Sequence, residues 1–481
     1  MPMNRRTLVA FLATALLTPS FSQAADMEIQ DVVVIGSGIA GCAAALSALE
    51  AGANKVLMLE QAPLIGGHSL MSSGSIAVIS PKRQSKQNIS DSVDDLWEDS
   101  QLVGGKSANE ELIRKIGNDS EEIIEWLETT GINFSPIVFQ CTGGLHPRCM
   151  ASNSGSAGKE YVLSLFQAAK NRGLSTILKA KVTRLHKLEN NLWEVTYSKD
   201  GETNFIRTLN VIIATGGFTD NKSLRKKYRP EISDEITSSA VTKNGYFAYA
   251  LGDGIALAQA NGAKITNMSS IQLLPLYGGR IVDYVGADIF VNLNGKRFVD
   301  EGASWKEIEK ALLRLPHNEM WVITDSKSKK GLHLASKLNN GTIQKSRSIE
   351  EMADGMGIKP SVLKKTIDDY NQAVIDKNDV FGKKTFTQKI DTPPFYWGKE
   401  KLQAHMTLGG ICINKKAEVL AITGSVIPGL FACGETTGNI FGHDRLGGMS
   451  LTSALVFGRE AGINAASRAL AIRTTTPSLG W

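Results

Sequence analysis

The sequence has few cysteines, and none of them stands in a motif for haem attachment or metal binding. Its 481 residues include 5 cysteines and no Cys-x-x-Cys-His run, so the sequence contains no site for a c-type haem. Five scattered cysteines also exclude a disulfide scaffold. Cys42, Cys412 and Cys433 lie in apolar stretches and are expected to be buried. Cys141 and Cys149 flank a glycine-containing loop, and whether they are bridged stays open.

The sequence also lacks a strong charge of either sign and any low-complexity run. The formal net charge is +5 at pH 7, a mild excess that argues against nucleic acid as a partner. With 42% hydrophobic and 21% charged residues, the composition is typical of a globular protein large enough for two domains. Glycine, by contrast, is abundant. The 46 glycines gather in short clusters, which favours a backbone that approaches a bound ligand closely.

The first 25 residues have the order of charged, apolar and small residues that is typical of an export signal. Arg5 and Arg6 precede an apolar run over residues 8–17, and small residues follow at 22–25. The apolar run is too short to anchor the chain stably in a bilayer. Because the two arginines are adjacent, we predict a twin-arginine signal, cleavage near Ala25 and a periplasmic location.

A strand, a glycine turn and a helix follow one another after this segment. Residues 31–35 form a β-branched run that leads into Gly36-Ser37-Gly38-Ile39-Ala40-Gly41, and a helix of small residues comes next. Gly36 permits a tight turn, Gly38 lets the backbone approach a pyrophosphate, and Gly41 lets the helix pack on the strand. A second strand delivers Glu60 about 20 residues later, where a carboxylate holds ribose hydroxyls. The pattern predicts a bound dinucleotide.

Further glycine-rich segments favour FAD over a nicotinamide cofactor. A Gly/Ser loop follows Glu60 at residues 66–75, and two distant strands, 211–214 and 429–432, each end at glycines. Segments so far apart along the chain indicate one long cofactor that both ends of the chain contact. The cofactor contacts predicted in these segments are Gly66, Gly67, His68, Ser69, Ser73, Gly74, Ala214, Thr215, Gly216, Gly217, Gly434 and Glu435. Only one dinucleotide fingerprint is present, so a separate nicotinamide site is not expected.

Three segments near the end of the chain carry a family resemblance. Residues 405–410 (HMTLGG), 430–435 (LFACGE) and 445–451 (RLGGMSL) resemble the C-terminal signature of fumarate reductase and succinate dehydrogenase flavoprotein subunits. The likeness runs from about residue 31 to 466 and is closest to soluble periplasmic flavocytochrome c reductases. It implies that Gly448, Ser450 and Leu451 cover the flavin and that Val182 lies near the adenine.

The resemblance also implies an α/β fold with a Rossmann-like FAD-binding domain and an inserted α+β capping domain, the clamp, which closes over the substrate. We expect the FAD-binding domain to comprise residues 26–266 and 405–470, the clamp residues 267–404, and a tail residues 471–481. Within these limits, Ser107-x-x-Glu110 predicts a capping box at the start of one helix, and residues 119–130 predict another. Asn294-Gly295 predicts a type I′ hairpin turn.

Reduction of a conjugated alkene requires a hydride, a cation on the substrate's carboxylate or carbonyl, and an acid that protonates the neighbouring carbon. The resemblance implies that Arg445 binds the substrate and also contacts the cofactor, and that His405 takes part in substrate binding. The family's catalytic arginine, however, corresponds to Trp305, which is no useful proton donor. Leu274 and Met406 likewise stand where the family has histidines. We therefore expect a substrate less charged than fumarate.

Three other residues are candidates for the missing acid. Lys306 follows Trp305 directly, and Tyr277 and Tyr284 lie in a loop that we expect to face the flavin. A lysine ammonium or a phenol can protonate an enolate-like carbon. Each of them also has an ordinary structural explanation, a solvated lysine or a tyrosine in the core.

Three functions fit these features. The leading hypothesis is a periplasmic FAD-dependent reductase of a 2-enoate or similar conjugated acceptor, supplied with electrons by a separate c-type cytochrome. The second is a dehydrogenase that runs in the opposite direction, as in ketosteroid dehydrogenases. The third is an electron-transfer flavoprotein subunit without its own substrate. His68 leaves open whether FAD is covalently attached.

Overall fold

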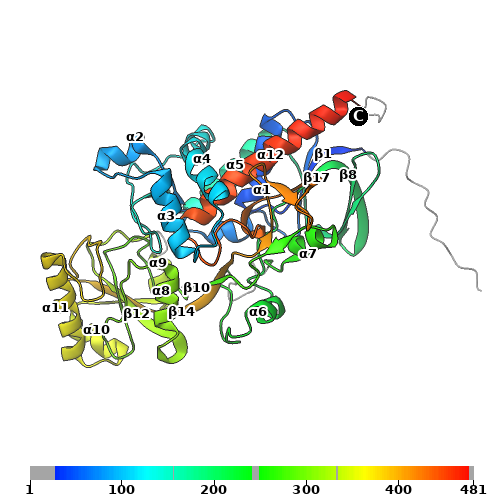
Figure 1. Ribbon diagram of the computed structural model, residues 1–481. Helices are drawn as coiled ribbons and strands as arrows, with labels where there is room; N and C mark the ends of the chain where they lie inside the picture. Colours follow the sequence, from blue (N-terminus) through cyan, green and yellow to red (C-terminus); the bar gives the residue numbers. More distant parts are fainter. Residues whose placement is uncertain (1–27, 155, 241–248, 332–333, 476–481) are drawn as a thin grey trace, which may run out of the picture.

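The structure is a computed structural model that describes residues 28–154, 156–240, 249–331 and 334–475 (Figure 1). The predicted export signal lies outside the described residues. No helix within the described residues is long and apolar enough to cross a membrane.

The helices and strands alternate along most of the chain. The helices are α1 (Ile39–Glu50), α2 (Pro81–Gln84), α3 (Val93–Val103), α4 (Glu110–Thr129), α5 (Ala157–Asn171), α6 (Lys222–Tyr228), α7 (Asp253–Ala260), α8 (Trp305–Leu312), α9 (Leu334–Asn339), α10 (Ile349–Met356), α11 (Pro360–Asp376) and α12 (Met449–Thr475). The strands are β1 (Gln30–Ile35), β2 (Val56–Glu60), β3 (Ile76–Ala77), β4 (Cys149–Met150), β5 (Ser175–Leu178), β6 (Lys181–Lys187), β7 (Trp193–Lys199), β8 (Glu202–Ile213), β9 (Ile265–Thr266), β10 (Ile271–Pro275), β11 (Ile289–Val291), β12 (Glu319–Thr324), β13 (Ile343–Ser346), β14 (Phe395–Thr407), β15 (Gly410–Ile411), β16 (Glu418–Leu420) and β17 (Val426–Ala432).

The larger sheet has eight strands and joins the two ends of the chain. Its order is β16-β17-β8-β1-β2-β5, and β6 and β7 extend it beside β8. β1 pairs in parallel with β2 and β8, and β17 pairs in parallel with β8. The carboxyl ends of these parallel strands therefore meet at one edge, where doubly wound sheets bind their ligands.

Small residues let α1 and α12 lie side by side over this sheet (Figure 1). A Cβ atom at Gly462 would lie 2.2 Å from the carbonyl oxygen of Ala44, and one at Gly458 would lie 2.7 Å from that of Ala40. Glycine is required because the backbones approach one another too closely for any side chain. The predicted α/β fold with a dinucleotide-binding sheet is confirmed.

A second sheet of five strands forms the clamp. Its order is β10-β14-β12-β11, with β13 also on β14. Helices α10 and α11 pack together beside it at the end of the molecule far from α12 (Figure 1). The long strand β14 leads from this sheet back to the FAD-binding domain. Its last residue, Thr407, donates its backbone N–H to Glu435, which follows β17 of the larger sheet.

Two local predictions are wrong. One continuous helix, α4, replaces the two helices expected around residues 107–130, and its cap is Asn109, whose side chain accepts a hydrogen bond from Leu112 N. Ser107 instead donates to the carbonyl of Gly104. The turn at Asn294-Gly295 is not type I′, because that turn needs positive φ at both residues and only Gly295 has it, at 79°.

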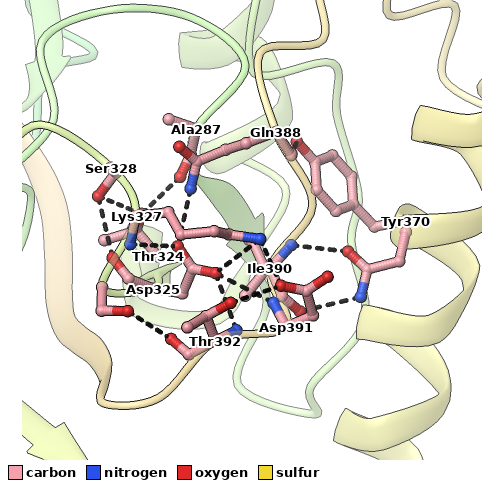
Figure 2. Close-up of polar contacts among 12 residues, drawn as sticks. Ala287, Thr324, Asp325, Lys327, Ser328, Tyr370, Gln388, Ile390, Asp391 and Thr392 are labelled. Atoms are coloured by element: carbon pink, nitrogen blue, oxygen red, sulfur yellow. Dashed lines mark hydrogen bonds and ion pairs between the residues drawn. The ribbon is translucent and has the colours of Figure 1, made fainter.

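A buried carboxylate organises one end of the clamp. Asp325 follows β12 and is 0% exposed. One of its oxygens accepts from Lys327 N (3.0 Å) and Gln388 Nε2 (2.7 Å). The other accepts from the backbone N–H groups of Asp391 (3.1 Å) and Thr392 (3.0 Å), as Figure 2 shows. These bonds fasten the segment before β14 to the end of β12.

We predict that Asp325→Asn lowers the free energy of unfolding by about 3 kcal/mol. The amide nitrogen cannot accept, so buried donors lose their partner while the residue keeps its size. Asp391→Asn is the matched control, because its side chain is 46% exposed and its ion pair with Lys327 lies at the surface. Denaturant unfolding of both variants measures the difference. Equal stability of the two variants would contradict this role of Asp325.

Candidate functional site

A cavity of about 740 Å³ lies along the carboxyl edge of the larger sheet and extends to the clamp. Its volume is in the upper range of ligand pockets. The predicted cofactor residues that line it are Gly36, Gly38, Ile39, Ala40, Glu60, Gly67, His68, Ser69, Val182, Ala214, Thr215, Gly216, Gly434, Glu435, Ser450 and Leu451. The structure thus brings together segments that are hundreds of residues apart in sequence.

The three glycines of the fingerprint have two kinds of surroundings. A Cβ atom at Gly36 would lie 2.3 Å from Ala214 O, and one at Gly41 would lie 2.0 Å from Gly36 O. These two glycines are therefore needed for packing between β1, β8 and α1. At Gly38 the nearest atom would be Ser69 Oγ at 3.5 Å, so this glycine faces the cavity and leaves room for a ligand.

Glu60 ends β2 with its carboxylate in the cavity wall. One oxygen accepts from Ser37 N (2.9 Å) and Ser37 Oγ (2.6 Å), and the other accepts from Ala62 N (2.7 Å). These bonds fix the carboxylate, and the second oxygen keeps lone-pair capacity for a ribose hydroxyl.

The cavity fits a dinucleotide with a flavin. The hydroxyl of Thr215 is buried without a hydrogen-bond partner among the residues that the structure describes, which is typical of a polar atom that a ligand satisfies. Gly216 has positive φ, and a Cβ atom there would meet nothing within 4 Å. The amino ends of α1 and α12 both reach the cavity and have no acidic residue in their first turns, which favours an anionic or electron-rich ligand.

Six predicted cofactor residues other than Arg445 do not line the cavity. They are Gly41, Gly66, Ser73, Gly74, Gly217 and Gly448. Packing explains several of them. A Cβ atom would meet Leu70 at Gly66, Ala157 at Gly74 and Cys149 at Gly448. These glycines shape the loops around the cavity.

Arg445 lies behind the cavity wall beside Met406. Its side chain is 6% exposed, and its Nε lies 3.3 Å from the Met406 sulfur, which lines the cavity. Nη1 donates to the carbonyl of Leu446. No carboxylate of the described residues forms an ion pair with this guanidinium, since Asp444 bonds to Gln272 instead. A buried cation of this kind favours an anionic partner.

His405 faces the same part of the cavity, as the sequence predicts. Its Nδ1 lies 3.0 Å from Ser239 Oγ, and both residues line the cavity. Burial, together with the positive charges of Arg445 and His68, lowers the pKa of His405 to about 3. The imidazole is therefore neutral at physiological pH, and it acts as a hydrogen-bonding group and not as a general acid.

The other predicted acids lie elsewhere. Lys306 Nζ lies 3.2 Å from both carboxylate oxygens of Glu309. Tyr277 is 51% exposed and lies under Lys401. Tyr284 accepts a hydrogen bond from Lys329 N, and burial raises its pKa. None of these three residues lines the cavity.

The cysteine pair lies close to Arg445. Cys141 Sγ is 2.8 Å from Cys149 Sγ, and both thiols are buried and unbridged. The hydrogen bond with Cys149 and burial raise the pKa of Cys141. A Cβ atom at Gly447 would lie 2.6 Å from Cys141 Sγ, so the pair packs against the glycines that follow Arg445.

Sequence reasoning missed the clamp side of the cavity. Leu276, Gly278 and Lys337 of the clamp line it, and Ser239 of the FAD-binding domain lies next to His405 in the same lining. None of them belongs to a motif, and Lys337 lies on the short helix α9. Only the packing of the two domains reveals them.

Comparisons with known proteins agree with this geometry. Residues 31–451 match the family described as FAD binding domain. The chain is 33% identical over 465 residues to a probable fumarate reductase of Shewanella frigidimarina, with 93% of this chain and 76% of that protein covered. It is 32% identical over 464 residues to a urocanate reductase of Eggerthella lenta, with 91% and 75% covered.

A solved structure of a fumarate reductase is also similar to this chain. The open conformation of a flavocytochrome c3 fumarate reductase is similar with a TM-score of 0.70 and 32% sequence identity, covering 92% of this chain and 79% of that chain.

We predict that Gly38→Ala weakens FAD binding by about 1–3 kcal/mol, because the added methyl group enters space that the ligand needs. The φ angle of −63° accepts alanine, so the fold is retained. Gly331→Ala is the control, since a Cβ atom there would meet nothing within 4 Å. Flavin absorbance per chain after gel filtration measures the effect. Full flavin content in the Gly38 variant would show that this backbone does not contact FAD.

Proposed function

Because the chain belongs to the FAD-binding family of fumarate reductase-like flavoproteins, we propose that it reduces the carbon–carbon double bond of a 2-enoate or similar conjugated acceptor. The family match confirms the predicted cofactor, FAD, and makes the chain an FAD-dependent oxidoreductase that acts on carbon–carbon bonds. Bound FAD supplies the hydride for such a reduction. The chain's own residues bind the acceptor, orient it and deliver a proton.

One observation carries the choice of an acid as the acceptor. The Arg445 guanidinium is buried behind the cavity wall at Met406 without a carboxylate partner from the described residues. An unpaired buried charge costs several kcal/mol, and a bidentate bond to a substrate carboxylate offsets this cost. The same cation withdraws electrons from the double bond that is conjugated to the carboxylate, which favours hydride addition.

The apolar residues at the positions discussed above favour a monocarboxylate over fumarate. Met406 and Leu276 line the cavity with apolar surface. Leu274 and Trp305, at 2% and 7% exposure, are packed in the core. A second carboxylate of a substrate finds no arginine or histidine at these positions and pays for its desolvation. The urocanate reductase among the relatives acts, by its name, on a conjugated acid other than fumarate.

We propose further that the protein works in the periplasm and receives its electrons from a separate c-type cytochrome. The order of residues in the first 25 positions supports export. The single dinucleotide fingerprint, which FAD uses, supports a protein electron donor over a nicotinamide. Fractionation of cells that express the full chain tests the location, and flavin reduction by reduced small cytochromes c tests the donor.

We predict that Arg445→Ala lowers kcat/KM for 2-enoates by about two to three orders of magnitude, because the substrate carboxylate loses its buried partner. The assay reduces the enzyme anaerobically with dithionite and follows flavin reoxidation by acrylate, crotonate, cinnamate and urocanate. Arg459→Ala is the control, an arginine of α12 that pairs with Glu122 at the surface.

Two results would count against the proposal in different ways. If no 2-enoate reoxidises the wild-type flavin, the proposed reaction is wrong. If a 2-enoate does so and Arg445→Ala reacts equally fast, the reaction stands but Arg445 is not the anchor.

A further inference from the structure

The proposed reduction needs a proton donor, and the predicted donors do not reach the cavity. Trp305 packs its indole on Gly143, where a Cβ atom would lie 2.2 Å from the ring. Lys306 is paired with Glu309, and Tyr277 and Tyr284 lie outside the cavity. The donor therefore has to be found among the groups that line the cavity.

Most charged groups in the lining already have another partner or lie at the other end. Glu60 accepts from Ser37, and Lys181 pairs with Asp253 at 3.2 Å. Glu60 and Lys181 lie in the part of the FAD-binding domain where the sequence predicts the ribose and adenine. At the opposite end, Glu435 accepts from Thr407 N, and His68 lies 3.1 Å from Asp220. His405 is a poor proton donor, because its imidazole is neutral and would have to become an imidazolate to give up its remaining N–H proton.

Lys337 is the cationic side chain that the clamp contributes to the lining. It comes from α9 and shares the cavity with His405, Met406 and Gly278. Its Nζ donates to the carbonyl of Arg280 at 2.5 Å, which holds the ammonium at the loop that carries Gly278. A lysine ammonium has three protons, so two stay available for a ligand.

Glu400 lies next to this lysine under the same loop. It is on β14, is 1% exposed, and accepts with one oxygen from Gly278 N (3.0 Å) and Arg280 N (2.8 Å). Its other oxygen is buried without a hydrogen-bond partner from the described residues. A buried carboxylate beside a lysine tunes the proton affinity of that lysine.

We propose that Lys337 is the general acid of the reduction and that Glu400 is the residue that positions and tunes it. The inference rests on the proposed function. One alkene carbon takes up the hydride, and the former π-electron pair forms a C–H bond at the neighbouring carbon with a proton from Lys337 Nζ. The N–H electron pair stays on nitrogen as a neutral amine, and solvent water reprotonates it after product release. The substrate gains one hydride and one proton in total.

The charges around Lys337 come from β14 and from the loop between β10 and β11. Burial lowers its pKa, the carboxylates of Glu400 on β14 and Asp283 in the loop raise it, and the guanidinium of Arg280 lowers it. The pKa of Glu400 is raised to about 7, and burial is the main cause. The N–H groups of Arg280 and Gly278 and the charge of Lys337 act in the opposite direction and lower it. A lysine with a lowered pKa is a better acid near neutral pH than an exposed one.

Three expectations follow for kinetics with the 2-enoate that reoxidises wild-type enzyme fastest. Lys337→Met lowers kcat by about 10²–10⁴-fold, the usual contribution of a general acid, while KM changes by less than about threefold because Arg445 holds the substrate. The kcat of wild-type enzyme falls as pH rises through the pKa of Lys337. Glu400→Gln moves this fall to lower pH, because it removes a negative charge that favours the ammonium.

A second measurement needs neither turnover nor a variant at Lys337. Trace labelling of FAD-loaded enzyme with acetic anhydride across pH, read by peptide mass spectrometry, gives the titration of each lysine. Lys337 is expected to titrate at lower pH than Lys365, whose side chain is 75% exposed, and lower still in Glu400→Gln. Lys365→Met is the control for turnover, and flavin absorbance shows whether each variant has folded.

The possible results separate the two proposals. If no 2-enoate reoxidises the wild type, the proposed function fails whatever Lys337 does. If turnover occurs and Lys337→Met keeps kcat within about threefold, or raises only KM, Lys337 is not the acid. If Lys337 titrates with Lys365, or Glu400→Gln leaves its titration unchanged, the tuning by Glu400 is wrong.

Discussion

The site depends on backbone contacts that only glycine permits. β1 and β8 end so close together that a Cβ atom at Gly36 would lie 2.3 Å from Ala214 O, and α1 starts against the same turn through Gly41. Further along, Gly458 and Gly462 let α12 lie against α1. These contacts bring two segments from opposite ends of the chain to one cavity, and they leave the open side of Gly38 facing that cavity.

The chemistry at the far end of the cavity depends on a different constraint, the cost of buried charge. Arg445 is desolvated and has a methionine sulfur and a carbonyl as its neighbours. Met406, which lies beside it, and Leu276 line the cavity with apolar surface. A buried cation without a carboxylate partner from the described residues selects a ligand that brings a negative charge, since a neutral ligand would leave the cation desolvated without compensation.

The clamp contributes the proposed proton donor, Lys337, to the cavity. Its polar groups are fixed by buried hydrogen bonds, as Asp325 fixes the segment before β14 and Glu400 fixes the loop at Gly278 and Arg280. Lys337 is attached to that loop through the Arg280 carbonyl. The proton and the hydride thus reach the substrate from different domains, which ties turnover to the arrangement of the two domains.

Local sequence determined the cofactor half of the site. The glycine turn after β1, Glu60 at the end of β2 and the glycine ends of β8 and β17 predict FAD because their roles depend on spacing along the chain and on the absence of a side chain. Spacing did not distinguish glycines that face the ligand, such as Gly38 and Gly216, from those that pack on protein, such as Gly41. Tertiary structure alone decided that distinction.

Tertiary structure also decided the catalytic half. Lys306, Tyr277 and Tyr284 are near Trp305 or the predicted flavin loop in sequence, yet none of them lines the cavity. Lys306 pairs with the buried Glu309, Tyr277 lies under Lys401, and Tyr284 accepts from Lys329 N. Lys337 and Glu400 are 63 residues apart (400 − 337) in unrelated elements and meet only because α9 and β14 pack on the same loop. Burial and neighbouring charge set the proton affinity of such groups, and neither is written in a local motif.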